Sequence, residues 1–204
     1  MLLAAVAGAA CRTAADRQGP PIVQPGAPGE SSRVIAPEKA IDLSHVQHTA
    51  ADVRFMQGMI GHHAQALDMT ALLRSRTSRE DMRMLAQRIE LSQADEIKMM
   101  QRWLEVRRQE VTSVHAHHAH GAILMPGMLT EEEMGRLAAA KGAEFDRLFL
   151  EFMIKHHEGA LIMVQQLFST PGAGQEAEIF SFASDVDADQ RIEIERMREM
   201  LDTR

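Results

Sequence analysis

Two copies of a Met-x-x-His-His pattern are the residues best suited to chemistry in this chain. Each copy places a methionine three and four residues before a histidine pair: Met59, His62 and His63 in the first copy, and Met153, His156 and His157 in the second. On a helix such residues share a face, so each methionine can share one ion with its histidines. Thioether sulfur is a soft ligand and imidazole a borderline one, which favours Cu(I) or Ag(I) over Mg²⁺, Ca²⁺ or Mn²⁺.

Further soft ligands follow each copy. Met69 and Met163 lie about two turns after the histidine pairs, in a separate layer of the same face, and are secondary candidates. Di-iron four-helix proteins use Glu-x-x-His at the corresponding place, a motif that this sequence lacks. The replacement of a carboxylate by methionine argues against di-iron oxidase chemistry.

A second candidate site lies between the two copies. Four histidines fall within six residues: His115, His117, His118 and His120. In a linker they could satisfy Cu(II), Ni(II) or Zn²⁺, with Met125 and Met128 adding soft ligands nearby. The alternative is a solvated polar linker. His45 and His48 form a weaker candidate pair.

The competing interpretation of the central histidines is structural. Methionines at helical spacing often fill a core, and a buried histidine can be hydrogen-bonded by Gln93, Gln190 or a carboxylate. Asp52 and Asp146 also recur in the two copies and are supporting candidates. A capping role explains Asp52, but Asp146 has Ala143 rather than Ser or Thr three residues before it.

An internal repeat organises the rest of the chain. Residues around 52–69 match 146–163 at an offset of 94, and after a three-residue shift Gln93 and Glu96 match Gln190 and Glu193. The repeats span about 49–109 and 143–203, joined by a linker at 110–129 and a short helix at 130–142. We expect capping boxes at Thr49/Asp52, Ser78/Asp81 and Thr130/Glu133, and no strands. The predicted fold is all-α, an antiparallel four-helix bundle of ferritin-like type built from two repeated helical hairpins.

The first residues resemble an export signal. Residues 1–11 are small and apolar and end at the only cysteine, Cys11, as in a bacterial lipoprotein signal. Residues 12–44 are rich in proline and glycine and predict a disordered tether before a bundle at 45–204. We therefore expect export to the periplasm or cell envelope, with Cys11 lipidated; a frayed terminus and a passive tail are the alternatives.

Composition narrows the function classes. The 204 residues suit one domain or two very small ones, and a net charge of −7 disfavours nucleic-acid binding. No apolar run is long enough to span a bilayer, and one cysteine rules out an intramolecular disulfide. Since nucleophile and phosphate-binding motifs are absent, we expect no enzyme.

The motifs together resemble a known family. The Asp52-to-Met69 pattern, its second copy through His156 and His157, and the intervening Met125-Pro126-Gly127-Met128 are similar to domain-of-unknown-function family 305, whose relatives include CopM-like periplasmic copper-binding proteins. The resemblance covers roughly 45–203 and implies an exported helical bundle that binds copper. The predicted function is copper sequestration or transfer without turnover, with a metal donor or acceptor protein as partner. The alternatives are a structural or partner-binding bundle and, third, a ferritin-like redox enzyme.

Overall fold

The computed structural model describes residues 20–24, 31–40, 46–113 and 124–203. The chain divides into two compact units, residues 1–45 and 46–204. In the first unit β1 (Ile22–Gln24) pairs antiparallel with β2 (Arg33–Ile35), and α1 (Pro37–Ala40) follows. The expectation of no strands is therefore wrong here. The β-branched pair Val23 and Val34 stands in register, and such residues favour extended pairing when proline and glycine separate the strands.

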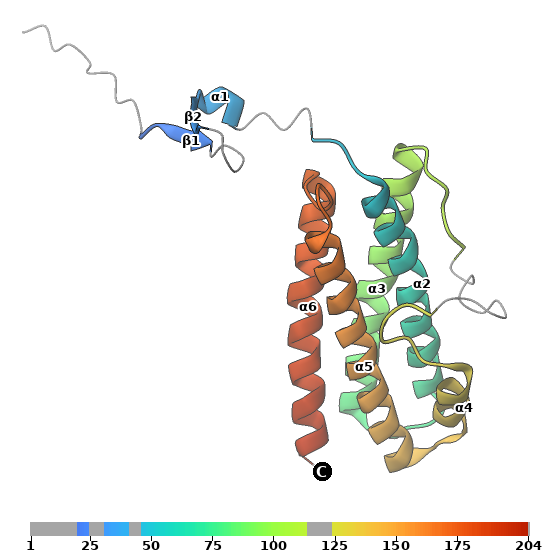
Figure 1. The fold of residues 1–204 in the computed structure, drawn as a ribbon. Coiled ribbons are helices and arrows are strands. Elements are labelled where there is room, and N and C mark those ends of the chain that lie inside the picture. Colours follow the sequence, from blue (N-terminus) through green and yellow to red (C-terminus); the bar gives the residue numbers. More distant parts are fainter. Residues whose placement is uncertain (1–19, 25–30, 41–45, 114–123, 204) are drawn as a thin grey trace, which may run out of the picture. The chain divides into compact units, whose positions relative to one another are not determined.

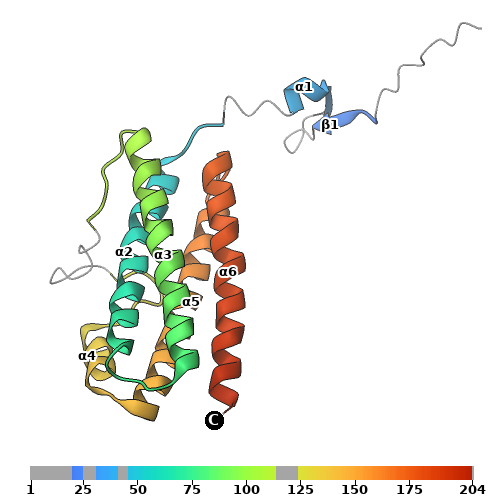
Figure 2. The same ribbon diagram turned by 180° about the vertical axis from the view of Figure 1, so that it is seen from behind.

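The second unit is helical, as predicted. It consists of α2 (Ala50–Leu73), α3 (Glu80–Val106), the short α4 (Glu131–Ala139), α5 (Gly142–Ser169) and α6 (Ala177–Asp202). The four long helices lie side by side (Figures 1 and 2). α2 packs along α3, α5 packs along α6, and the two pairs meet through α2 and α5, whereas α3 and α6 hardly approach each other. Within the described residues, no helix is long and apolar enough to cross a membrane.

Local capping explains where two of the helices begin. The Thr49/Asp52 box at the start of α2 and the Thr130/Glu133 box at the start of α4 are both confirmed, each with reciprocal side-chain and backbone bonds. The predicted Ser78/Asp81 box is wrong. α3 begins one residue later, with Arg79 as its N-cap and no side-chain capping bond, because Asp81 is instead paired with the Arg79 side chain.

The apolar core of the helical unit is divided into two clusters. The first apolar cluster includes Phe55, Met56, Met59, Ile60, Met100, Leu104, Met163, Val164, Phe182 and Val186. The second apolar cluster includes Met69, Leu73, Met82, Ile89, Phe145, Phe149, Met153 and Met197. On every long helix, buried polar residues lie between the two clusters. The helices therefore enclose a polar layer across the middle of the core.

Candidate metal centre

The polar layer contains the two predicted histidine pairs. His62 and His63 come from α2, His156 and His157 from α5, and all four side chains are fully buried. The rings of His62 and His156 lie with centroids 3.8 Å apart, and each lies 6.2–6.3 Å from the ring of its neighbour in sequence. The structure thus brings together four imidazoles that the sequence holds about 94 residues apart.

Carboxylates from α3 and α6 contact one histidine of each pair. His63 Nε2 lies 2.6 Å from Glu96 Oε2 on α3, and His157 Nε2 lies 2.6 Å from Glu193 Oε2 on α6. Sequence reasoning missed both glutamates as members of the site. The available signal was their recurrence at equivalent positions of the repeat, three residues after the matched Gln93 and Gln190.

Several polar atoms of the layer have no partner in the described part of the chain. They are the Nδ1 atoms of all four histidines, Nε2 of His156, both amide atoms of Gln93 and Oε1 of Gln190. Buried polar groups are nearly always hydrogen-bonded, so unpaired nitrogens in such number call for an explanation. Burial, and then repulsion from His63, lowers the pKa of His62 to about 3. Burial and the neighbouring imidazoles lower the pKa of His156 well below its usual value. Both rings are therefore neutral at pH 7 and carry a lone pair.

The predicted methionine ligands flank the layer. Met59 and Met153 are fully buried, each one turn before its histidine pair. Met59 belongs to the first apolar cluster and Met153 to the second, so they lie on opposite sides of the layer. Met69 and Met163 lie deeper in the second and the first cluster respectively, outside the layer.

The segment between the linker and α4 crosses α2 and α5 beside the layer. Pro126 O lies 3.0 Å from His62 Nε2 and accepts a hydrogen bond from it. The close approach depends on glycine: a Cβ at Gly159 would lie 2.0 Å from Pro126 O, and Gly127, at φ 77°, packs on the same point of α5. Gln65 fixes the segment further through two hydrogen bonds to the backbone of Leu129.

The predicted soft ligands of this segment take separate places. Met128 is buried, and Met125 is partly buried against the first apolar cluster. A Cβ built at Gly58 would lie 3.4 Å from Met125 Sδ and 3.5 Å from Met163 Cε. Met125 and Met163 therefore converge over Gly58, one turn before His62.

The supporting residues divide between the layer and the ends of the helices. Gln93 and Gln190 are buried on the inner faces of α3 and α6, one turn before Glu96 and Glu193. Asp52 lies at an end of the unit, where Oδ2 accepts from Thr49 N and Oδ1 accepts from Gly174 N at 2.7 Å. Its role is structural. Asp146 is buried near the start of α5 with Oδ1 unpartnered among the described residues.

Other predicted sites are not described or lie elsewhere. Cys11, His45 and the linker histidines lie outside the described residues: His115, His117, His118 and His120. His48 packs edge-on against Trp103, with ring centroids 5.4 Å apart. It does not join the histidine layer.

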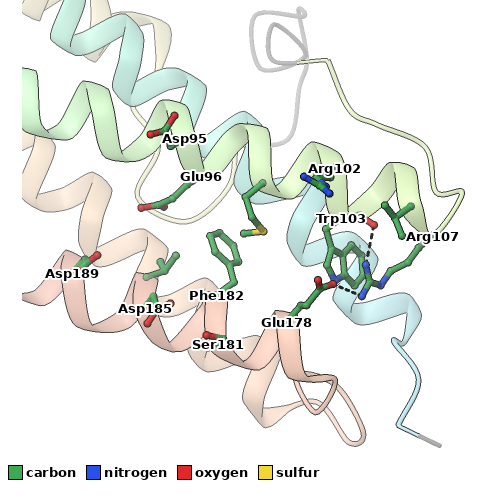
Figure 3. Close-up of a pocket in the computed structure, with 13 residues that line it drawn as sticks. Asp95, Glu96, Arg102, Trp103, Arg107, Glu178, Ser181, Phe182, Asp185 and Asp189 are labelled. Carbon is green, nitrogen blue, oxygen red and sulfur yellow. Dashed lines mark hydrogen bonds and ion pairs between the residues drawn. The ribbon is translucent and has the colours of Figure 1, made fainter. Parts of the chain in front are cut away.

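A groove of about 770 Å³ lies along α3 and α6, and Glu96, which contacts His63, is among the residues that line it. Glu96, Asp185 and Asp189 face it at one end, and Trp103, Arg107 and Glu178 line the other (Figure 3). Burial and repulsion from Glu96, Glu193 and Asp185 raise the pKa of Asp189. The two carboxylates that contact the buried histidines, Glu96 and Glu193, thus belong to a cluster of acidic side chains on α3 and α6 that also includes Asp185 and Asp189.

The donor set suits a soft or borderline cation. It offers imidazole nitrogens without partners among the described residues and two buried thioethers, in a layer whose histidine side chains are fully buried. No group of three or more histidine, cysteine, aspartate or glutamate side chains in the described ranges is placed to hold a metal ion. An ion in the layer would therefore need thioether ligands or a rotation of the imidazole rings. The residues fit copper by donor type and burial.

Comparisons with solved structures find proteins of the same fold. A DUF305 protein from Streptomyces coelicolor is 29% identical with a TM-score of 0.65, covering 75% of this chain and 93% of its own. A DUF305 fragment from Deinococcus radiodurans is 32% identical with a TM-score of 0.66, covering 77% and 99%.

CopM in its Cu(I)-bound form is 26% identical with a TM-score of 0.60, covering 77% and 98%; it has also been solved with Cu(II) and with Ag. A comparison with proteins of curated function gives no match. The DUF305 family model, a domain of unknown function, matches residues 52–201. The chain is therefore a member of the DUF305 family.

Proposed function

We propose that this protein is an exported metal-binding protein that sequesters or hands on copper through the histidine layer. One observation carries the proposal: four fully buried imidazoles from α2 and α5 have five ring nitrogens without a partner among the described residues. Leaving a buried polar group unpaired costs about 1–3 kcal/mol. A bound soft cation would offset this cost at several atoms at once.

Copper is the metal that the donors and the relatives favour together. Met59 and Met153 supply thioether sulfur on the two sides of the layer, which favours Cu(I). The structures of CopM with Cu(I), Cu(II) and Ag support the same metal class. The linker histidines remain a proposed capture site for Cu(II), Ni(II) or Zn²⁺.

We further propose a bundle architecture for the helical unit, export of the protein, and binding of the ion without catalysis. We interpret the four long helices as an antiparallel bundle of two repeated hairpins, because the His63–Glu96 and His157–Glu193 contacts are equivalent in both halves. Export rests on the apolar segment before Cys11 and on the description of the Streptomyces coelicolor relative as a secreted protein. The protein binds and releases its cargo without catalysis, with a donor or acceptor protein as partner and Cys11 as a lipid anchor.

A competition titration tests the proposal. The full chain is titrated with Cu(I) under reductant against a chelator of known affinity, and with Cu(II) without reductant. A layer variant replaces His62, His63, His156 and His157 by alanine. A linker variant replaces the histidines at 115, 117, 118 and 120. The matched single control is His48→Ala, since His48 packs on Trp103 away from the layer.

We expect Cu(I) binding that is lost in the layer variant and kept in the linker variant and in His48→Ala. Circular dichroism verifies that the layer variant remains helical. Equal binding by the layer variant and the parent would refute the layer as the site and move it to the linker. No binding by the parent would favour a structural or partner-binding bundle.

A further inference from the structure

Glu96 and Glu193 contact the histidine layer from outside in the same way. Each carboxylate oxygen lies 2.6 Å from Nε2 of a fully buried histidine, His63 or His157. An ionised carboxylate can only accept, so the hydrogen in each contact belongs to the imidazole Nε2. In a neutral imidazole, hydrogen on Nε2 leaves the lone pair on Nδ1.

We propose that Glu96 and Glu193 are positioning residues that hold His63 and His157 in the Nε2–H tautomer, so that Nδ1 of each binds the cargo ion. The inference rests on the proposed function, which it deepens by naming the ligand atoms and the groups that orient them. Both Nδ1 atoms are buried and have no partner among the described residues. The two ring nitrogens point in different directions, so Nδ1 cannot face the glutamate that Nε2 contacts.

The third contact of the layer follows the same pattern. His62 Nε2 lies 3.0 Å from Pro126 O, a backbone carbonyl that can only accept. Its Nδ1 is likewise buried and without a partner. Three of the four rings are thus oriented at Nε2 by an acceptor and offer Nδ1. Acceptors beyond a metal-binding histidine commonly fix its tautomer and raise its basicity.

The two glutamates are held unequally. Ser92 Oγ donates to Glu96 Oε1 at 2.8 Å, so both oxygens of Glu96 have a partner. The repeat places Asp189 where the first half has Ser92, and Asp189 repels Glu193 instead of donating to it. Glu96 is therefore the better-oriented carboxylate. We expect its replacement to weaken binding more than replacement of Glu193.

Long-range proton–nitrogen NMR correlation on the ¹⁵N-labelled full chain reads the tautomers directly. Spectra at neutral pH are recorded without metal and then with Ag(I), a diamagnetic and air-stable probe for Cu(I). The variants are Glu96→Gln and Glu193→Gln. The matched controls are Glu90→Gln on α3 and Glu195→Gln on α6, which lose the same charge from exposed pairs with Arg74 and Arg198.

We expect a hydrogen on Nε2 of His63 and His157 without metal, and a shift of their Nδ1 resonances with Ag(I). Loss of an orienting partner typically weakens metal affinity by about 10–100-fold. We therefore expect the Ag(I) affinity of Glu96→Gln to fall by about 10–100-fold, and the controls to bind Ag(I) as the parent does. Melting curves verify that all variants fold.

Several results would overturn the inference. A hydrogen on Nδ1, or a doubly protonated ring, in the metal-free protein contradicts it even if Ag(I) binds. The Nε2–H tautomer with Ag(I) bound and no change at Nδ1 contradicts the assignment of the ligand atoms. Ag(I) bound nowhere in the chain would remove the proposed function as well, and the metal-free spectrum separates these failures.

Discussion

Replacement of Gly159 by alanine tests whether the segment at Pro126 and Gly127, which packs on α5, holds His62 in place. A Cβ at this position would lie 2.0 Å from Pro126 O and 2.4 Å from Pro126 C. Both atoms are backbone, so no side-chain rotation can relieve the overlap. The segment must therefore move away from α5, and the hydrogen bond from His62 Nε2 to Pro126 O must lengthen or break.

The magnitude follows from three contributions. Alanine in a helix interior gains about 0.5–1 kcal/mol over glycine. Overpacking costs about 1–3 kcal/mol, and a buried N–H of His62 left without its acceptor costs another 1–3 kcal/mol or so. We expect Gly159→Ala to lower the free energy of unfolding by about 1–5 kcal/mol.

The assay is urea unfolding of the full chain followed by far-UV circular dichroism. Gly61→Ala is the matched control, because Gly61 lies in the interior of α2 and a Cβ there would meet nothing within 4 Å. The control should gain about 0.5–1 kcal/mol. If Gly159→Ala were as stable as the parent or more stable, the segment would not depend on this contact and the reasoning would be refuted.

Four further predictions concern charge and ligand. The pKa of His62 is about 3 in the folded protein against 6.5 ordinarily, so the unfolded chain takes up a proton at this histidine first as the pH falls. The free energy of unfolding should therefore fall by up to about 5 kcal/mol as the pH drops from 6.5 to 3. In acid titrations, His62→Gln should flatten this fall. Arg107→Ala should cost about 1–3 kcal/mol in urea unfolding, because Oε1 of the largely buried Glu176 loses its partner while Oε2 keeps only the Trp103 Nε1 bond; replacement of the exposed groove residue Arg102 by alanine should change little. Asp189→Asn should slow Ag(I) uptake in stopped flow at low salt, and equal rates would contradict electrostatic attraction into the groove. Finally, Ag(I) at about 100 times its dissociation constant should raise the free energy of unfolding by ~2.7 kcal/mol, and a chelator should reverse the gain.

Local pattern was sufficient for much of the fold. Helical periodicity and the capping boxes at Thr49 and Thr130 depend on residues three or four apart, so they can be read from sequence. The box at Ser78 failed because Asp81 pairs with the Arg79 side chain. The strand pair at Val23 and Val34 escaped prediction because each strand is only three residues long.

The candidate site was likewise predictable in its residue types but not in its contacts. Two Met-x-x-His-His copies on the inner faces of helices determine that imidazole and thioether are buried together, since residues three and four apart share a face. Only the tertiary structure decided that the ring of His62 lies against that of His156, and that Glu96 and Glu193 contact the other two rings. It also excluded Asp52 from the layer by using both its oxygens at a helix end. These outcomes depend on how α2 packs against α5 and on which residues of α3 and α6 face the histidines. Such long-range packing cannot be read from the spacing of residues along one helix.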